Sequence, residues 1–529
     1  MTVVLSRTTI GDVYPGAQLP ELADKPAIVM ADTGRTVSYA ELEDRSVRLA
    51  HVLRDAGLRP GDGVALLSPN DPLYYDCYWA ALRSGLYLTA VSTYLAVEEQ
   101  LYILGDCEAR VLVVHADLAE RAQEIRAAVA EQAPHLELFL SYGGRVEGFD
   151  DLDDALAAAS AEPLADQPAG TDMLYSSGTT GRPKAIRAPL PARQISEPGD
   201  LLLAVFAPTY GFDADTVYLS PAPLYHAAPL RFCGLVHMVG GTVVIMPRFE
   251  PEQGLAAIER HRATHSQWVP TMFVRMLKLP DDVRGRYDVS SLRVAIHAAA
   301  PCPVEVKQQM IEWWGPILHE YYSATEAAGV TLIGPEDWLG HPGSVGRAGL
   351  GVIHVCDEAD PDQPDLPVGE DGLVYFERDA MPFEYLHDPA KTASAQHPHH
   401  DNWATTGDIG HVDDEGYLYL TDRRAFMIIS GGVNIYPQEI ENALALHPKV
   451  LDVAVIGVPD AEMGEQVKAV VQPAPGHEPG PALAAELTEF VRGRIAHYKA
   501  PRSVDFVEEL PRTPTGKLLK REVRARYPR

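Results

Sequence analysis

Hydrophobic residues in the N-terminal third of the chain alternate between helical and strand-like spacing. Ser-Tyr-Ala-Glu at 38–41 has the layout of a capping box, and an amphipathic run with Leu42 and Leu49 follows it. Short apolar runs at 64–67 and 111–114 are typical of buried strands, and residues 74–82 predict a helix. This alternation of strands and helices predicts an α/β fold.

The middle of the chain contains further apolar runs. They predict strands at 201–206, 216–220, 242–246 and 292–296. Residues 143–170 are rich in Asp, Ala and Gly, and this composition predicts an excursion over the protein surface.

A polar break at 421–424 follows a strand-like run and marks a candidate domain boundary. Beyond it the pattern predicts a compact α/β unit, with strands near 452–457, 467–472 and 503–507 and a helix near 481–496. We therefore predict two domains, 1–422 and 423–529, with the boundary near 422–425.

The charge of the chain narrows the classes of partner. The 529 residues include 44 Lys and Arg against 74 Asp and Glu, a net charge of −30. Such an acidic protein is a poor candidate for general nucleic-acid binding or for docking on anionic membranes. Residues 423–529 are close to neutral and end in a basic stretch, which suggests contact with a polyanionic ligand, although a solvated helix face explains the same pattern.

The cysteines and the N-terminus indicate the compartment. Five scattered cysteines without CxxC spacing favour reduced thiols over disulfides or a zinc site. No apolar run approaches the roughly 20 residues that cross a bilayer, so we expect no transmembrane segment. The first residues lack the layout of a signal peptide, and we expect a cytoplasmic protein.

Residues 175–184 form a glycine-rich loop with the chemistry of a phosphate cradle. Their order is Tyr-Ser-Ser-Gly-Thr-Thr-Gly-Arg-Pro-Lys. Glycines let backbone N–H groups approach an anion, hydroxyls add donors, and Lys184 adds a positive charge. The spacing is not that of a Walker loop. A flexible Ser/Gly turn is the simpler interpretation of most such clusters, but this order of ten residues makes a cradle the better one.

At this loop the chain resembles the adenylate-forming superfamily, which includes acyl-CoA synthetases, luciferases and peptide-synthetase adenylation domains. Further segments resemble the family's motifs in the family's order. They are Pro-Leu-Tyr-His at 223–226, Ala-Ala-Pro at 299–301, Tyr-Ser-Ala-Thr-Glu at 322–326, Thr-Gly-Asp at 406–408, Ser-Gly-Gly-Val-Asn-Ile-Tyr-Pro at 430–437 and Pro-Arg-Thr-Pro-Thr-Gly-Lys at 511–517.

The resemblance implies a role for each matching residue. Lys517 would bridge the substrate carboxylate and the phosphate, Thr325 would donate to the α-phosphate, and Glu326 would hold Mg²⁺. The implied ATP and AMP site comprises Ser176, Ser177, Gly178, Thr179, Thr180, Gly181, Lys184, Ala299, Ala300, Pro301, Glu320, Tyr321, Tyr322, Asp408 and Arg423. The implied acyl pocket comprises His226, Thr271, Phe273, His297, Ala298 and Cys302. Gly431 and Gly432 would line a coenzyme A tunnel, and Ala425 would be the hinge.

The same resemblance implies a fold and a reaction. The fold would be a large N-terminal α/β body of several subdomains with a small, mobile C-terminal α/β domain. The acid and Mg·ATP would give acyl-AMP and pyrophosphate, and the thiol of coenzyme A would then give acyl-CoA and AMP. The co-substrates would be ATP and coenzyme A, with Mg²⁺ and a small-molecule carboxylic acid. A homodimer is compatible with the sequence, which indicates no oligomeric state.

Several alternatives stay open. The acid is a fatty acid or an aryl or arylpropenoic acid, and the sequence does not rank them. An enzyme that loads a carrier protein or stops at acyl-AMP, and an inactive nucleotide-binding homologue, are the competing functions. His226 could equally be a structural histidine of the core.

Some residues depart from the family pattern. Ala425 replaces a charged hinge residue, Ala185 and Ser323 replace glycines, and Pro229 occurs where the pocket segment commonly has glycine. The histidine-rich segment 397–401 matches no zinc spacing, and we expect it to be an exposed loop.

Overall fold

The structure is a computed structural model, and it describes residues 14–176, 183–357, 365–423, 426–430, 433–460, 463–512 and 518–527. Backbone contacts divide the chain into two compact units. Unit 1 comprises residues 1–267, 281–294 and 383–389, and unit 2 comprises residues 268–280, 295–382 and 390–529. The predicted boundary near 422–425 stays a prediction, and Ala425 lies outside the described residues.

Unit 1 contains an eight-stranded sheet in the order β19-β9-β8-β4-β3-β5-β6-β7. Its strands are β3 (Gly63–Leu67), β4 (Tyr87–Val91), β5 (Ala109–His115), β6 (Leu138–Tyr142), β7 (Asp150–Asp151), β8 (Thr171–Ser176), β9 (Lys184–Arg187) and β19 (Glu384–Tyr385). Strands β3 and β5 confirm the two strands predicted at 64–67 and 111–114.

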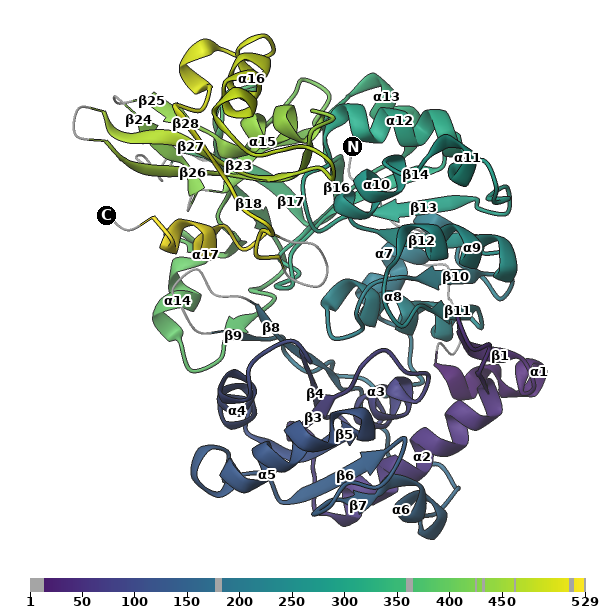
Figure 1. Cartoon of the computed structure of the whole chain (residues 1–529). Helices are drawn as coiled ribbons and strands as arrows, with labels where there is room; N and C mark the ends of the chain where they lie inside the picture. Colours follow the sequence, from purple (N-terminus) through teal and green to yellow (C-terminus); the bar gives the residue numbers. More distant parts are fainter. Residues whose placement is uncertain are drawn as a thin grey trace. The chain divides into compact units, whose positions relative to one another are not determined.

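Helices α4 (Val97–Asp106) and α5 (Ala119–Gln132) cover one face of this sheet (Figure 1). Their apolar side chains join those of β3 and β5 in one buried cluster, in which Leu104, Ile125 and Leu112 are at most 1% exposed. Such burial is the main force that holds a helix on a sheet.

Other helices of unit 1 follow the sequence pattern closely. Helix α2 (Tyr39–Asp55) begins with the predicted capping box, since the Ser38 side chain accepts from the Glu41 backbone and Glu41 accepts from the Ser38 backbone. Helix α3 (Tyr74–Leu82) has the predicted bounds. The segment 143–170 is mostly exposed, as expected, but it contains α6 (Leu152–Ala158), whose N-cap is Asp151 and whose Leu152 and Leu156 are buried.

The prediction of a strand at 201–206 is wrong, because these residues begin α7 (Leu201–Tyr210). The Asp200 side chain accepts a hydrogen bond from the Leu203 backbone and caps the helix, and Gly211 ends it in the left-handed conformation, with φ at 67°. A run of Leu, Ala, Val and Phe carries no periodicity that separates a buried helix from a buried strand.

The second set of strands in unit 1 runs in the order β2-β1-β11-β10-β12. These are β1 (Pro26–Met30), β2 (Thr36–Ser38), β10 (Val217–Ser220), β11 (Thr242–Ile245) and β12 (His265–Trp268). The remaining helical segments of the unit are η1 (Pro15–Gln18), α1 (Leu19–Leu22), η2 (Ala116–Leu118), α8 (Ala227–Met238), α9 (Pro251–His261) and α11 (Asp281–Arg284). Strands β10 and β11 confirm the strands predicted at 216–220 and 242–246.

Unit 2 begins with α10 (Pro270–Leu277) and a group of strands in the order β13-β14-β15-β16. These are β13 (Val294–His297), β14 (Leu318–Tyr322), β15 (Val330–Ile333) and β16 (Arg347–Leu350). Strands β13 and β14 are parallel, and α12 (Val304–Trp314) connects them. Strand β13 confirms the strand predicted near 292–296.

A six-stranded sheet of unit 2 has the order β20-β21-β18-β22-β23, with β17 paired to β18. Its strands are β17 (Val352–Cys356), β18 (Gly372–Glu377), β20 (Gln396–His397), β21 (His400–Ala404), β22 (Asp408–Val412) and β23 (Leu418–Arg423). Helices α13 (Pro335–Gly340) and α14 (Pro389–Ser394) complete this part of the chain.

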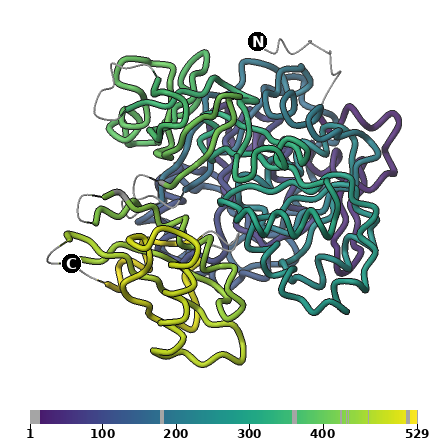
Figure 2. The backbone as a smooth tube through the Cα atoms, turned by 90° about the horizontal axis from the view of Figure 1, so that it is seen from above, coloured from purple at the N-terminus to yellow at the C-terminus, as the bar shows by residue number. Residues whose placement is uncertain are grey.

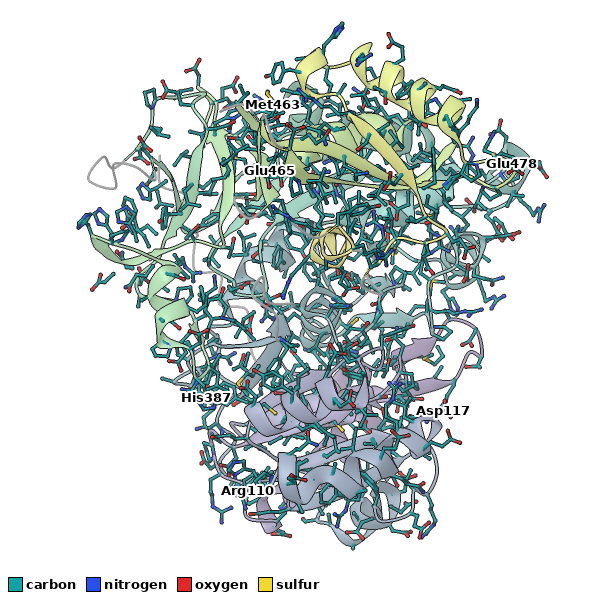
Figure 3. The ribbon with its side chains drawn as sticks, turned by 60° about the vertical axis from the view of Figure 1, so that its left-hand side comes forward. Arg110, Asp117, His387, Met463, Glu465 and Glu478 are labelled. Carbon is teal, nitrogen blue, oxygen red and sulfur yellow. The ribbon has the colours of Figure 1, made fainter. Side chains whose placement is uncertain are left out.

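The last sheet of unit 2 comes from the C-terminal residues, whose backbone path runs from green to yellow in Figure 2. Strands β24 (Ile428–Ser430), β25 (Val433–Ile435), β26 (Val450–Asp460), β27 (Gly464–Pro473) and β28 (Ser503–Phe506) form it. Its helical segments are α15 (Pro437–Ala445), α16 (Pro481–Arg492), η4 (His497–Lys499) and α17 (Lys520–Ala525). Strands β26, β27 and β28 and helix α16 confirm the strands predicted near 452–457, 467–472 and 503–507 and the helix predicted near 481–496. Figure 3 labels Met463 and Glu465 beside the β26–β27 turn.

No helix within the described ranges is both long and apolar enough to cross a membrane.

Candidate functional site

Two predicted nucleotide-binding segments leave neighbouring parallel strands at the same end. His297, the last residue of β13, lies opposite Glu320 of β14. Residues 298–301 follow β13, and residues 322–326 begin at the end of β14. In α/β sheets, ligands bind outside the carboxyl ends of the strands, so this edge of unit 2 is a candidate site.

The turn after β13 has an unusual backbone. Ala299 has φ at 73°, a left-handed conformation that non-glycine residues rarely adopt. Ala298 is buried at 5% exposure, while Ala299 and Pro301 are exposed and Ala300 is partly exposed. A strained backbone with small, exposed side chains lets a flat ligand approach the main chain closely.

Tyr322 and Asp408 meet although 86 positions separate them in the sequence. The Tyr322 hydroxyl donates to Asp408 Oδ2 at 2.6 Å, and the Thr406 hydroxyl donates to the same oxygen at 2.7 Å. Asp408 is the first residue of β22 and is only 5% exposed. The structure therefore brings together two residues of the implied ATP and AMP site.

Ser323 gives a reason for one departure from the family pattern. Its hydroxyl donates to the Gly329 carbonyl at 2.7 Å and ties the segment 322–326 to the start of the next strand. A glycine at this position would lack that hydrogen bond. Thr325 and Glu326 follow as partly exposed residues of the same segment.

A buried ion pair lies beneath this edge of the sheet, and the sequence analysis did not identify its cation, Lys307. Lys307 of α12 has no exposed surface, and its Nζ donates to Glu320 Oε2 at 2.7 Å. The same ammonium lies 4.6 Å from the centre of the Trp338 ring. A signal was available, since Lys307 shares the apolar face of its helix with Met310 and Trp314, at positions i+3 and i+7.

Burial shifts the pKa of the two titratable side chains beside Lys307, Glu320 and His297. Burial raises the pKa of the Glu320 carboxyl, and the Lys307 ammonium opposes that shift. Burial, together with the nearby Lys307 charge, holds the pKa of His297 well below its ordinary value. His297 Nε2 lies 3.5 Å from Glu320 Oε2. His297 is therefore neutral at physiological pH.

Two residues predicted for the acyl pocket, Phe273 and His297, belong to an aromatic cluster of unit 2. Phe273 of α10 packs edge-on against His297 at 5.6 Å between ring centres. Trp314 lies 6.0 Å from Phe273 and 5.6 Å from Trp268. Thr271 is on the same helix, and burial raises the pKa of the Cys302 thiol. Trp268 and Trp314 are buried members of the same aromatic cluster.

Unit 1 holds the two described ends of the predicted cradle. Ser176 and Lys184 are directly opposite each other on the antiparallel strands β8 and β9. The Lys184 ammonium donates to the Asp388 carboxylate, a partner that the motif did not indicate. Asp388 follows His387, which has φ at 57° and is labelled in Figure 3.

His226 and Pro229 are at the beginning of α8. His226 is the N-cap residue of this helix, and its ring lies 4.4 Å from that of Tyr225. Pro229 is buried in the first turn, where a missing backbone N–H leaves no helical hydrogen bond unmade.

Other predicted residues fall outside the described part of the chain. They are Ser177, Gly178, Thr179, Thr180, Gly181, Ala425, Gly431, Gly432 and Lys517. The backbone of Arg423 ends β23, and the structure describes nothing of its side chain.

The expectation of an exposed loop at 397–401 is confirmed for Pro398 and His399, which form an exposed turn, and is wrong for His397 and His400. His397 and His400 belong to the antiparallel strands β20 and β21, and His397 is only 3% exposed. Its ring contacts those of Tyr375 and Trp403, and such aromatic packing buries the His397 side chain. In the part of the chain that the structure describes, no group of three His, Cys, Asp or Glu side chains is arranged to hold a metal.

Comparisons with known proteins match nearly the whole chain. A family model described as AMP-binding enzyme matches residues 17–386, and one described as AMP-binding enzyme C-terminal domain matches residues 439–517. A feruloyl-CoA synthase from Amycolatopsis sp is 36% identical over 504 residues, which cover 93% of this chain and 94% of that protein. The long-chain-fatty-acid–CoA ligase FadD13 of Mycobacterium tuberculosis is 32% identical over 505 residues, 95% of each chain.

A solved structure of the anthranilate CoA ligase AuaEII in complex with anthranoyl-AMP is similar in fold. It has a TM-score of 0.83 and 26% identity, and the match covers 97% of this chain and 96% of that one.

Proposed function

Since this chain belongs to the AMP-binding enzyme family and is an AMP-forming acid–CoA ligase, we propose that its acid substrate is an aryl or arylpropenoic acid. The reaction has two steps. The acid and ATP give acyl-AMP and pyrophosphate, and the thiol of coenzyme A then displaces AMP to give acyl-CoA.

The pairing of Tyr322 with Asp408 carries the proposal for nucleotide binding. The Tyr322 ring offers a flat face for adenine, and the Asp408 carboxylate accepts from the ribose hydroxyls. Ser176 and Lys184 supply a hydroxyl and a charge for the phosphates at the two ends of the cradle. Thr325 donates to the α-phosphate, where negative charge gathers during attack by the acid.

Glu326 fits the requirements of Mg²⁺. This ion usually takes one or two carboxylates from the protein and completes its shell with substrate phosphates and water. Glu326 is a partly exposed carboxylate in the same segment as Tyr322. Mg²⁺ bound there would neutralise charge on the phosphates, and Glu326 would hold and orient it.

Lys517 and the residues around it account for the alternation between the two steps. In the first step Lys517 neutralises charge on the acid carboxylate and the phosphate. Residues 423–529 then turn about Ala425, which takes Lys517 away and brings Gly431 and Gly432 to the coenzyme A arm. A backbone change at an alanine hinge needs no side-chain charge.

The aromatic cluster supports the choice of substrate class. Phe273 packs against His297, Trp314 packs against Phe273 and Trp268, and flat rings favour flat aromatic ligands. The similarity to a feruloyl-CoA synthase supports the same class. A long-chain fatty acid is the second candidate, supported by the similarity to FadD13.

A competition assay tests the substrate and the acceptor together. The purified chain is incubated with Mg·ATP, coenzyme A and equal amounts of benzoic, hydroxycinnamic and C8 to C16 aliphatic acids, and thioesters are identified by mass. We expect aromatic thioesters to dominate. Dominant aliphatic thioesters would overturn the substrate proposal. AMP and pyrophosphate without a thioester would indicate a carrier-protein acceptor or an adenylate product.

Two further properties stay predictions. A homodimer is checked by light scattering on the purified chain. A cytoplasmic location is checked by fractionation of the source cells.

A further inference from the structure

Lys278 joins the acyl-side helix of unit 2 to the C-terminal sheet of the same unit. It is the C-cap residue of α10, the helix that carries Thr271 and Phe273. Its Nζ donates to the Val450 carbonyl at 2.7 Å and lies 3.5 Å from the Leu451 carbonyl, at the start of β26. The contact spans 172 positions in the sequence.

The same end of β26 supports the segment that contains Lys517. Asp452, two residues after Val450, accepts from Arg512 Nε and, at 2.6 Å, from a terminal nitrogen of the same guanidinium. Such a two-point contact fixes the orientation of the arginine. Arg512 is the second residue of the motif at 511–517.

Backbone pairing closes the base of that segment. Arg512 and Leu518 form an antiparallel bridge, and the Leu519 N–H donates to the Pro511 carbonyl at 2.9 Å. Paired backbone at Arg512 and Leu518 therefore flanks the part of the motif that contains Lys517. A chain of contacts leads from Lys278 through β26 to this base.

The Lys278 ammonium lies near a carboxylate as well as the Val450 carbonyl. Lys278 is exposed as a residue, but desolvation of its ammonium lowers its pKa, and the nearby Asp452 carboxylate opposes this shift. Withdrawal of a cation from water is unfavourable unless its hydrogen bonds are replaced, as the Val450 carbonyl does here. The neighbouring Lys449 makes no such contact with α10 in the described structure. Its Nζ donates instead to Glu486 of α16 at 2.8 Å, so both partners belong to the C-terminal part of the chain.

We propose that Lys278 is a positioning residue for adenylation. Its contact with Val450 docks β26 onto α10, the helix that carries the predicted acid-binding residues Thr271 and Phe273. Through Asp452 and Arg512, β26 in turn holds the base of the segment that contains Lys517. The proposal rests on the role proposed for Lys517. If residues 423–529 turn between the two steps, the contact of Lys278 with Val450 exists in one arrangement and is lost in the other. Lys517 must meet the acid carboxylate during adenylation, and the contact links its segment to α10, so the contact belongs to that step.

Separate assays of the two half-reactions test the proposal. Adenylation is followed as pyrophosphate release with acid, ATP and a hydroxylamine trap, and thioester formation is followed from synthetic acyl-AMP and coenzyme A. For Lys278→Ala we expect adenylation to fall about tenfold while thioester formation stays within about twofold of the unchanged chain. Lys278→Arg should recover most of the adenylation rate, because arginine also donates from a cation. Asp452→Asn should reproduce the selective loss.

Lys449→Ala is the matched control, and both of its half-reactions should keep the original rates. Equal loss of both half-reactions in Lys278→Ala, no loss, or a loss confined to thioester formation would overturn the proposal. Lys517→Ala, assayed in parallel, separates the two ideas. If Lys517→Ala loses adenylation and Lys278→Ala does not, only the positioning role fails, whereas an active Lys517→Ala refutes the role of Lys517 itself.

Discussion

Lys307 Nζ lies 2.7 Å from Glu320 Oε2, and the two side chains form a buried ion pair between α12 and β14. Glu320 lies opposite His297, at the end of the strands from which the predicted nucleotide-binding segments leave. A buried ion pair therefore lies beneath this strand edge, with the His297 ring 3.5 Å from the Glu320 carboxylate and the centre of the Trp338 ring 4.6 Å from the Lys307 ammonium.

Removal of the cation alone should destabilise the protein. Lys307→Met leaves the Glu320 carboxylate buried without its partner, and we expect the free energy of unfolding to fall by about 3–5 kcal/mol. Urea denaturation measures the change. The double variant Lys307→Met, Glu320→Leu should recover most of the loss, because it removes both charges. Lys449→Met, at an exposed ion pair, should cost at most about 1 kcal/mol. A Lys307→Met chain as stable as the original would contradict the prediction.

Asp408 should govern affinity for ATP rather than for the acid. Asp408→Asn removes the charge that strengthens hydrogen bonds to ribose, so we expect KM for ATP to rise about tenfold with KM for the acid unchanged. Tyr322→Phe keeps the ring and loses only the hydroxyl contact with Asp408, so its effect should be smaller. The exposed Asp414, substituted by Asn, is the control. Equal changes in both KM values would argue against a nucleotide-specific role.

Lys517 should separate the two half-reactions most strongly. Lys517→Ala removes the positive charge that we propose stabilises the developing transition state, and we expect adenylation to slow by about 100- to 1,000-fold. Thioester formation from supplied acyl-AMP should persist, because the proposed turn of residues 423–529 removes Lys517 before that step. Single-turnover assays of each step provide the measurement. A parallel loss of both would refute this assignment.

His237 should make unit 1 less stable in acid. Burial lowers its pKa to about 3, and Trp79 donates to its Nδ1 at 3.3 Å, so the folded protein holds it neutral. The unfolded chain binds the proton below about pH 6.5, so the contribution of His237 is complete above that pH. It declines by about 1.4 kcal/mol per pH unit as the pH falls toward 3.

Urea denaturation between pH 4 and pH 7 measures this dependence. His237→Gln, which keeps an acceptor for Trp79, should lose that part of the slope. The exposed His135, substituted by Gln, should leave the slope unchanged. Identical slopes for His237→Gln and the original chain would exclude the mechanism.

Local pattern was enough to predict much of the fold. The capping box of α2, the bounds of α3 and the strands β3 and β5 follow from residues that are neighbours in the sequence. Local pattern failed at α7, because an unbroken apolar run fits a helix and a strand equally well. It also failed at His397, whose burial depends on the distant rings of Tyr375 and Trp403.

The sequence by itself determined the class of chemistry, because its local motifs resemble those of the adenylate-forming superfamily in the same order. Tertiary structure alone decided which side chains support them: Asp388 against Lys184, Lys307 against Glu320, and Lys278 against Val450. Each of these contacts joins residues that are distant along the chain or on different elements. No local propensity specifies such a pair, since its energy arises only when folding removes both partners from water.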